Sequence, residues 1–145
     1  MNENMELVMH IYKDAEMGAY ATNNLLTLLL KKENKIKNIL EYEIKEYEKY
    51  MNEAEIILEK NDIKPKTNSM MAKISSDMGI KMETIIDNSD AALAQMLIEG
   101  FTLGTLNMNS KIKKYKSVAD KKCLKLAQNF LEYQEKEIKK LKSFL

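Results

Sequence analysis

Apolar residues recur at helical spacing along almost the whole chain, and they predict five helical segments. When residues are placed at about 100° per position, the apolar ones gather on one face of each segment. We expect helices at about residues 3–31, 35–61, 68–87 and 90–115, and a last one from about Ser117 to the C-terminus. The joint near residues 31–34 is so short that the first two helices must be antiparallel neighbours. The pattern therefore predicts an all-α fold of four long helices, with a shorter returning helix between the second and third.

Capping and breaking residues agree with these limits. Asn2 or Asn4 is a suitable N-cap for the first helix, and Pro65 ends the second because proline lacks a backbone donor. Ser117-Val118-Ala119-Asp120 resembles a capping box and predicts the start of the last helix.

The third and fourth segments carry apolar residues that suit either packing or association. The third segment has a helical stripe of Met71, Ile74, Met78, Met82 and Ile85. The fourth segment has Leu103 and Leu106 on the back of its main apolar face, so it is apolar nearly all round and should be covered on two sides. Gly100 and Gly104 would let another helix approach it closely. Either segment is a candidate surface for a homodimer.

Composition narrows the class of protein. The 145 residues form one domain, with Lys+Arg 23 against Asp+Glu 22, so no net field attracts nucleic acid or anionic lipid. The lysine-rich stretch between residues 111 and 125 lacks arginines and interleaved surface aromatic residues, so we do not expect nucleic-acid binding. No apolar stretch approaches the roughly 20 residues needed to cross a bilayer. A single cysteine and an N-terminus unlike a signal peptide indicate a cytoplasmic protein.

Two glutamates stand out because each lies at the centre of an apolar helical face. Glu43 is central on the second helix and Glu137 on the last, where a charge is costly unless a partner meets it. We expect a polar layer inside the protein, formed around these carboxylates by Thr22, Tyr47, Gln95, Tyr133 and Gln134. Tyr47 and Tyr133 lie four residues from the glutamates, so each carboxylate has a possible hydrogen-bond donor on its own helix. A purely structural role and a metal site both remain open.

The arrangement resembles the ferritin and rubrerythrin superfamily, in which two antiparallel helix pairs joined by a long connection direct carboxylates inward. The stretches Tyr12–Gly18 and Met96–Gly104 are also similar to small ferritin-like proteins of low-GC Gram-positive bacteria. The resemblance implies a four-helix bundle and, in the di-iron members, a Glu on two helices and Glu-x-x-His on the other two.

Carrying these ligands over by position leaves the site incomplete. Glu43 matches a ligand, but Glu46 stands where the histidine is expected, and neither Gln134-x-x-Glu137 nor Glu137-x-x-Lys140 contains a histidine. Gln95 takes the place of a glutamate on the fourth helix. Glu16 lies at the edge of the first helix's stripe. The candidate ligands for iron or manganese are Glu16, Glu43, Glu46 and Glu137.

Other reactive residues have simpler interpretations. His10 lies one turn from Asp14, which favours an ion pair or a solvated position over metal binding. Cys123 faces inward without a histidine to activate it, so we expect a small buried hydrophobe.

No complete catalytic motif is present. We therefore expect a structural or binding protein that self-associates, and not an enzyme, with no cofactor. The alternative is a divergent iron or manganese oxidoreductase or storage protein that uses the inward carboxylates.

Overall fold

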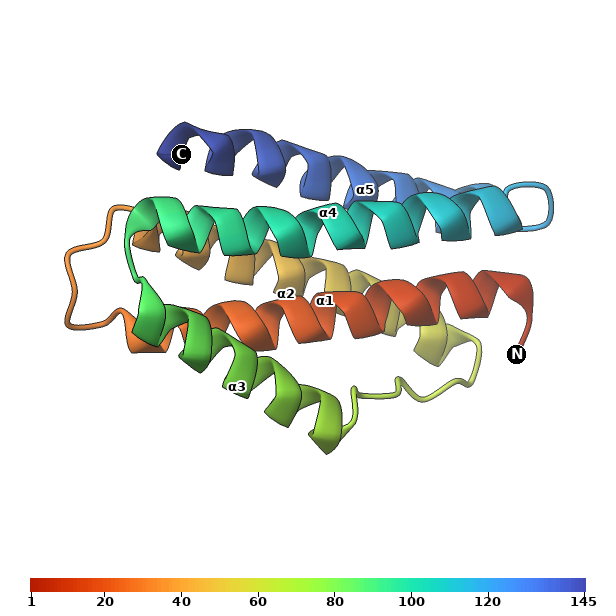
Figure 1. The fold of residues 1–145 in the computed structure, drawn as a ribbon. Helices are drawn as coiled ribbons and strands as arrows, with labels where there is room; N and C mark the ends of the chain where they lie inside the picture. Colours follow the sequence, from red (N-terminus) through yellow and green to blue (C-terminus); the bar gives the residue numbers. More distant parts are fainter.

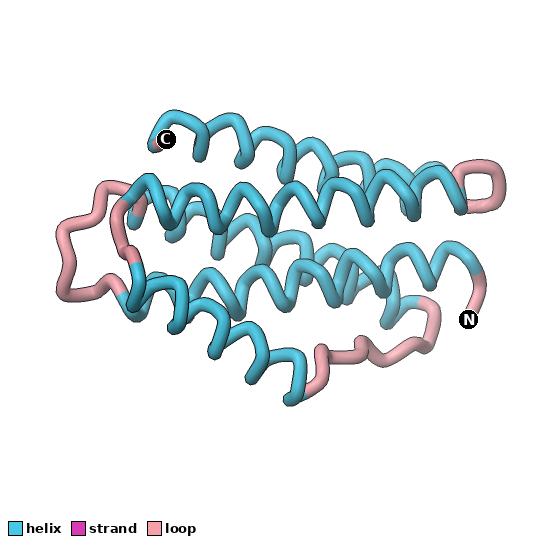
Figure 2. The backbone as a smooth tube through the Cα atoms, viewed as in Figure 1, coloured by secondary structure: helices cyan, strands magenta, loops and turns pink.

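The computed structural model describes residues 1–145, except for the side chain of Ile85, and the described chain consists of helices and their connections (Figures 1 and 2). This confirms the predicted all-α class and the five helical segments. A short 3-10 turn, Lys142–Phe144, follows the last helix. The helices are α1 (Glu3–Leu28), α2 (Lys37–Lys60), α3 (Met70–Ile86), α4 (Asp90–Tyr115) and α5 (Lys121–Leu141). No helix in the described part of the chain is long and apolar enough to cross a membrane.

Two antiparallel helix pairs make up most of the molecule. α1 packs mainly on α2, and α4 packs mainly on α5, while α3 lies along the outer side of α1 (Figure 1). The start of α4 is fixed beside the α1–α2 joint, because the Asn34 amide donates to the Asn88 carbonyl at 2.9 Å and to Asp90 Oδ1 at 3.0 Å. α4 therefore begins at the end of the molecule where α1 and α2 are joined. This agrees with the prediction that the third helix returns the chain to that end.

The helix starts follow the capping signals, with one correction. Asn2 caps α1 by accepting from the backbone N–H of Met5. Asp120 caps α5 by accepting from the Cys123 N–H at 2.8 Å. The expectation that this helix starts at Ser117 is wrong, because the Tyr115 carbonyl accepts from the backbone N–H of both Val118 and Ala119. Residues 117–119 thus close a turn after α4.

Aromatic side chains fill the centre of the interior, between α2 and α5 and against α4. The Tyr50 and Phe130 rings lie 5.0 Å apart, and the Tyr47 ring lies edge-on to Tyr133 at 5.5 Å and stacks on Phe101 at 5.9 Å. Such pairs add about 0.5–1.5 kcal/mol each beyond their buried area. This aromatic cluster holds the two helix pairs together.

α3 contacts α1 through polar side chains. The Tyr20 hydroxyl donates to Asp77 Oδ2 at 2.7 Å, and the Asn24 amide donates to the same carboxylate. Lys73 Nζ lies 3.7 Å from Glu16 Oε1. The helix is thus fixed by hydrogen bonds and an ion pair, with little apolar burial.

The apolar stripe of α3 faces the other way. Met71 is 76%, Met78 60% and Met82 63% exposed. We call Met71, Ile74, Met78 and Met82 the methionine face; Ile85, which completes the predicted stripe, has a side chain outside the described residues.

The back of α4 is also open. Leu103 and Leu106 are more than half exposed, so the expectation that α4 is covered on two sides is wrong within a single chain. α1, α2 and α5 cover only its inner face.

Candidate functional site

Two carboxylic acids face each other inside the protein, one from α2 and one from α5. Glu43 is 0% and Glu137 1% exposed. Lys140 Nζ lies 2.8 Å from Glu137 Oε2, while both Glu43 oxygens and Glu137 Oε1 are buried without a donor from another side chain or the backbone. The inward placement of both residues agrees with the helical periodicity. We call Glu43 and Glu137 the carboxyl pair.

Glu43 binds a proton more tightly than an ordinary glutamic acid does. Burial, followed by a hydrogen bond with Glu137 and its negative charge, raises the pKa of Glu43 to about 10, although Lys140 acts in the opposite direction. Burial therefore favours the neutral form of Glu43, in which its O–H can donate to Glu137. This sharing satisfies oxygens that two ionised carboxylates would leave unpaired.

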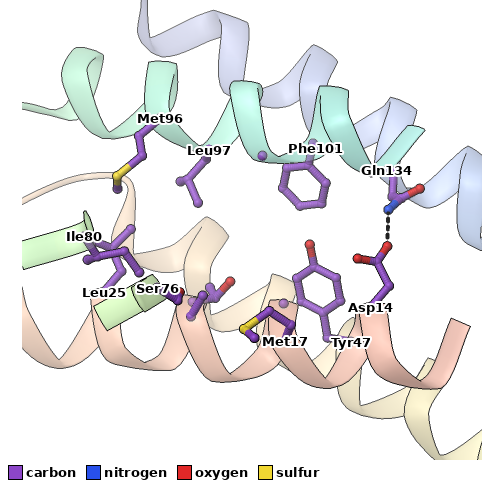
Figure 3. A pocket seen from close by; sticks show the side chains of 15 residues that line it. Asp14, Met17, Leu25, Tyr47, Ser76, Ile80, Met96, Leu97, Phe101 and Gln134 are labelled. Carbon is purple, nitrogen blue, oxygen red and sulfur yellow. Dashed lines mark hydrogen bonds between the residues drawn. The ribbon is translucent and has the colours of Figure 1, made fainter. Parts of the chain in front are cut away.

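The neighbouring tyrosines do not serve the glutamates as the sequence suggested. The Tyr133 hydroxyl donates at 3.4 Å to the backbone carbonyl of Glu43, not to a carboxylate. Tyr47 stacks on Phe101, and its hydroxyl extends between α1 and α4 (Figure 3). Burial first, and then Glu43, raises the pKa of Tyr47 well above its usual range. Ring packing has overridden the helical i, i+4 contact in both cases.

The other proposed ligands lie apart from the carboxyl pair or at its edge. Glu16 accepts from the Asn68 backbone N–H at 2.8 Å and from its amide at 3.0 Å, so it anchors the segment before α3. Glu46 lines a groove of about 290 Å³ between α2 and α5 that also reaches Glu137 and Lys140. Thr22 is buried and lines a different cavity, next to α4.

The prediction that Gln95 belongs to an inner polar layer is wrong. Gln95 is exposed, and its amide donates to Glu99 Oε1 at 3.2 Å. Leu93 and Ala94 occupy the buried face of α4 at this level, so the next residue along the helix points outward. Because α4 is apolar nearly all round, its pattern does not fix which face is inside.

Gln134 belongs to a second polar cluster that the sequence did not reveal. It is 2% exposed, and its amide donates to Asp14 Oδ2 at 3.2 Å. Burial raises the pKa of Asp14, and the bond from Gln134 lowers it in part. The sequence signal for this cluster is Gly104 on α4. A Cβ there would lie 2.5 Å from Gln134 Nε2, so a larger residue would block the approach of that side chain.

His10 and Cys123 have no activating partner among the described residues. Burial, then the charges of Lys111 and Lys13, lower the pKa of His10, and its Nε2 is buried without a hydrogen bond. The expected ion pair with Asp14 is therefore wrong, and the His10 side chain is half-buried. Burial, followed by Asp120, raises the pKa of Cys123 to about 12, which suits a packing role.

The residues at the carboxyl pair do not fit a two-metal centre of the ferritin type. Such a centre takes ligands from four helices, whereas this pair draws on α2 and α5, and Lys140 already occupies one of the four oxygens. In the described residues no group of three or more His, Cys, Asp or Glu side chains is arranged to hold a metal ion. Glu16, Glu43, Glu46 and Glu137 therefore do not converge on one point.

Comparison of the chain with models of known families, with curated proteins and with solved structures gives no match.

Proposed function

We propose that this protein is a ferritin-like four-helix bundle with an additional helix in its central connection, and that it is a structural or binding protein that forms a homodimer. The observation that carries the proposal is the orientation of α3. Its polar side bonds to α1 through Asp77 and Lys73, while its methionine face is exposed. An amphipathic helix normally buries its apolar stripe, so this one is best explained by a partner.

A second copy of the same helix suits this surface. The methionine face runs at three- and four-residue spacing from Met71 to Met82, so two antiparallel copies would meet along one continuous seam. Methionine side chains adapt to such contacts because they are unbranched and flexible.

Light scattering tests the proposal. We expect a mass near twice 16.8 kDa. Met78→Lys with Met82→Lys should give a monomer of unchanged helix content, because both changes place a charge in the seam. Ile56→Lys, at an exposed position on α2, is the matched control and should leave the dimer intact. A monomer for the unaltered chain at tens of micromolar would refute the dimer.

The second candidate is a divergent iron or manganese oxidoreductase or storage protein, and the burial of two inward carboxyl groups is the observation that favours it, although two ligands are too few for a two-metal centre of the ferritin type. Elemental analysis of protein from metal-supplemented cells separates the two functions. Our first proposal expects less than stoichiometric metal. Stoichiometric iron or manganese that is lost in Glu43→Ala would favour the second.

A cytoplasmic location is part of the first proposal. The free, buried thiol of Cys123 supports it, because reducing compartments keep thiols unpaired.

A further inference from the structure

A cavity of about 270 Å³ lies between α1 and α4, on the side that α3 covers (Figure 3). Most of its wall is apolar, and α1, α3 and α4 all contribute to it. The apolar lining includes Met17, Leu25, Ile80, Met96, Leu97 and Phe101. A mostly apolar cavity with a few converging polar groups is the usual form of a small-molecule site.

Three polar groups meet at one end of this cavity. Figure 3 shows the carboxylate of Asp14, the hydroxyl of Tyr47 and the amide of Gln134 gathered there. Gln134 is 2% exposed, and its Oε1 has no hydrogen-bond partner although its amide nitrogen is bound to Asp14. That oxygen has almost no accessible surface, so it faces the packed interior, and the polar groups that a molecule in the cavity can reach are those of Asp14 and Tyr47.

Two glycines allow distant side chains to reach this end. Tyr47 comes from α2 and crosses α1 at Gly18, where a Cβ would lie 2.4 Å from its ring. Gln134 comes from α5 and crosses α4 at Gly104, where a Cβ would lie 2.5 Å from its Nε2. Glycine inside a helix costs about 0.5–1 kcal/mol relative to alanine. Glycine is present at both Gly18 and Gly104, where a side chain from another helix enters the cavity, despite this loss of helix stability.

The polar end has more acceptors than donors. Burial raises the pKa of Asp14, and the hydrogen bond from Gln134 lowers it in part. The Asp14 carboxylate forms no ion pair with any described side chain. The acceptors that a ligand can reach are therefore Asp14 Oδ1 and the Tyr47 hydroxyl, which can also donate. A positively charged donor group complements this set better than a neutral or negative one.

We propose that this cavity binds a small organic amine, whose protonated amino group donates to Asp14 and to the Tyr47 hydroxyl oxygen while its apolar body lies against Leu97, Phe101 and the methionines. An engineered cavity of about 150 Å³ admits benzene, so this larger one has room for a single ring with a short aminoalkyl chain. The site is separate from the carboxyl pair and from the methionine face.

Calorimetric titration with 2-phenylethylamine tests the proposal, with 2-phenylethanol and phenylacetate as probes of nearly the same size. We expect one amine to bind per chain, about tenfold or more tighter than the alcohol, because a charged hydrogen bond replaces a neutral one. Phenylacetate should bind most weakly. Equal affinity for all three probes, or no saturable binding of the amine at millimolar concentration, would overturn the proposal.

Two variants locate the binding. Asp14→Asn should remove the preference for amine over alcohol, whereas Asp62→Asn, in the connection after α2, should retain it. Gly100→Leu adds a side chain at the cavity wall, where a Cβ would have no atom within 4 Å, and it should weaken the binding of both probes about tenfold or more. Gly79→Leu, also free of clashes but away from the cavity, is its matched control. Unchanged amine binding in Gly100→Leu would place the amine elsewhere and overturn the assignment.

Discussion

The contact between α2 and α5 and the contact between α1 and α3 are built in opposite ways. Between α2 and α5, aromatic rings bury one another around a pair of carboxyl groups. Between α1 and α3, one carboxylate accepts hydrogen bonds from two polar side chains while the methionine face points away. Both pairs of helices are amphipathic. The apolar stripe shows which residues share a face, but the available partners decide which face is turned inward.

The largest expected effect comes from the aromatic side of this comparison. Phe130 is fully buried and contacts Tyr47, Tyr50 and Tyr133. Phe130→Ala should lower the free energy of unfolding by about 3–5 kcal/mol, because it removes apolar contacts and leaves a cavity. Met82→Ala, on the exposed methionine face, should change it by less than about 0.5 kcal/mol in dilute monomer. Urea unfolding measures both, and equal losses would mean that α3 is packed as tightly as α5.

Glu43→Gln should stabilise the protein and flatten its pH dependence. The pKa of Glu43 is about 10 when folded against an ordinary value of 4.5, so the folded state holds a proton that the unfolded state releases between these values. Wild-type stability should therefore fall as pH rises from about 4.5 to about 10. The amide can still donate to Glu137, so the variant should gain about 1–3 kcal/mol at pH 8 and little at pH 4.5. Denaturant unfolding at both values measures this difference.

Glu41→Gln, at an exposed position on the same helix, is the control and should follow the wild-type pH profile. A large loss of stability in Glu43→Gln would show that the protein depends on the charge of Glu43, as a metal ligand would.

Asp77→Ala should loosen α3 without affecting the aromatic cluster. The change removes the acceptor for Tyr20 and Asn24, and we expect a loss of about 1–2 kcal/mol in the local stability of α3. Hydrogen exchange should accelerate for α3 amides and stay constant for α5 amides. Glu83→Ala, exposed on the same helix, should leave exchange nearly unchanged. Faster exchange in α5 would show that the two contacts are coupled.

The smallest effect distinguishes two glycines. Gly79→Ala should raise stability by about 0.5–1 kcal/mol, because its Cβ meets no atom and alanine favours helix. Gly18→Ala should instead destabilise the protein, because the Cβ would lie 2.4 Å from the Tyr47 ring. Thermal unfolding measures both. A gain in both variants would mean that Tyr47 moves aside freely.

The sequence predicted the helices and the inward faces of α2 and α5, because these depend on local periodicity. Glu43 and Glu137 could be placed inside for the same reason. Gln95 was misplaced because α4 is apolar on several sides. Asp14 and the second polar cluster were missed because their burial depends on Gln134, a residue 120 positions away. The outward turn of α3 depends on a similarly distant bond, from Tyr20 to Asp77, which no periodicity encodes.

The polar attachment of α3 also bears on the order in which the chain gains its structure. Each antiparallel pair joins helices that follow each other closely in sequence, and contacts of this kind form fastest during folding. The bond from Tyr20 to Asp77 closes a loop of 57 residues and brings little apolar burial with it. α3 should therefore be the last helix to settle on refolding and the first to detach in the native state, with its methionines accessible in either condition.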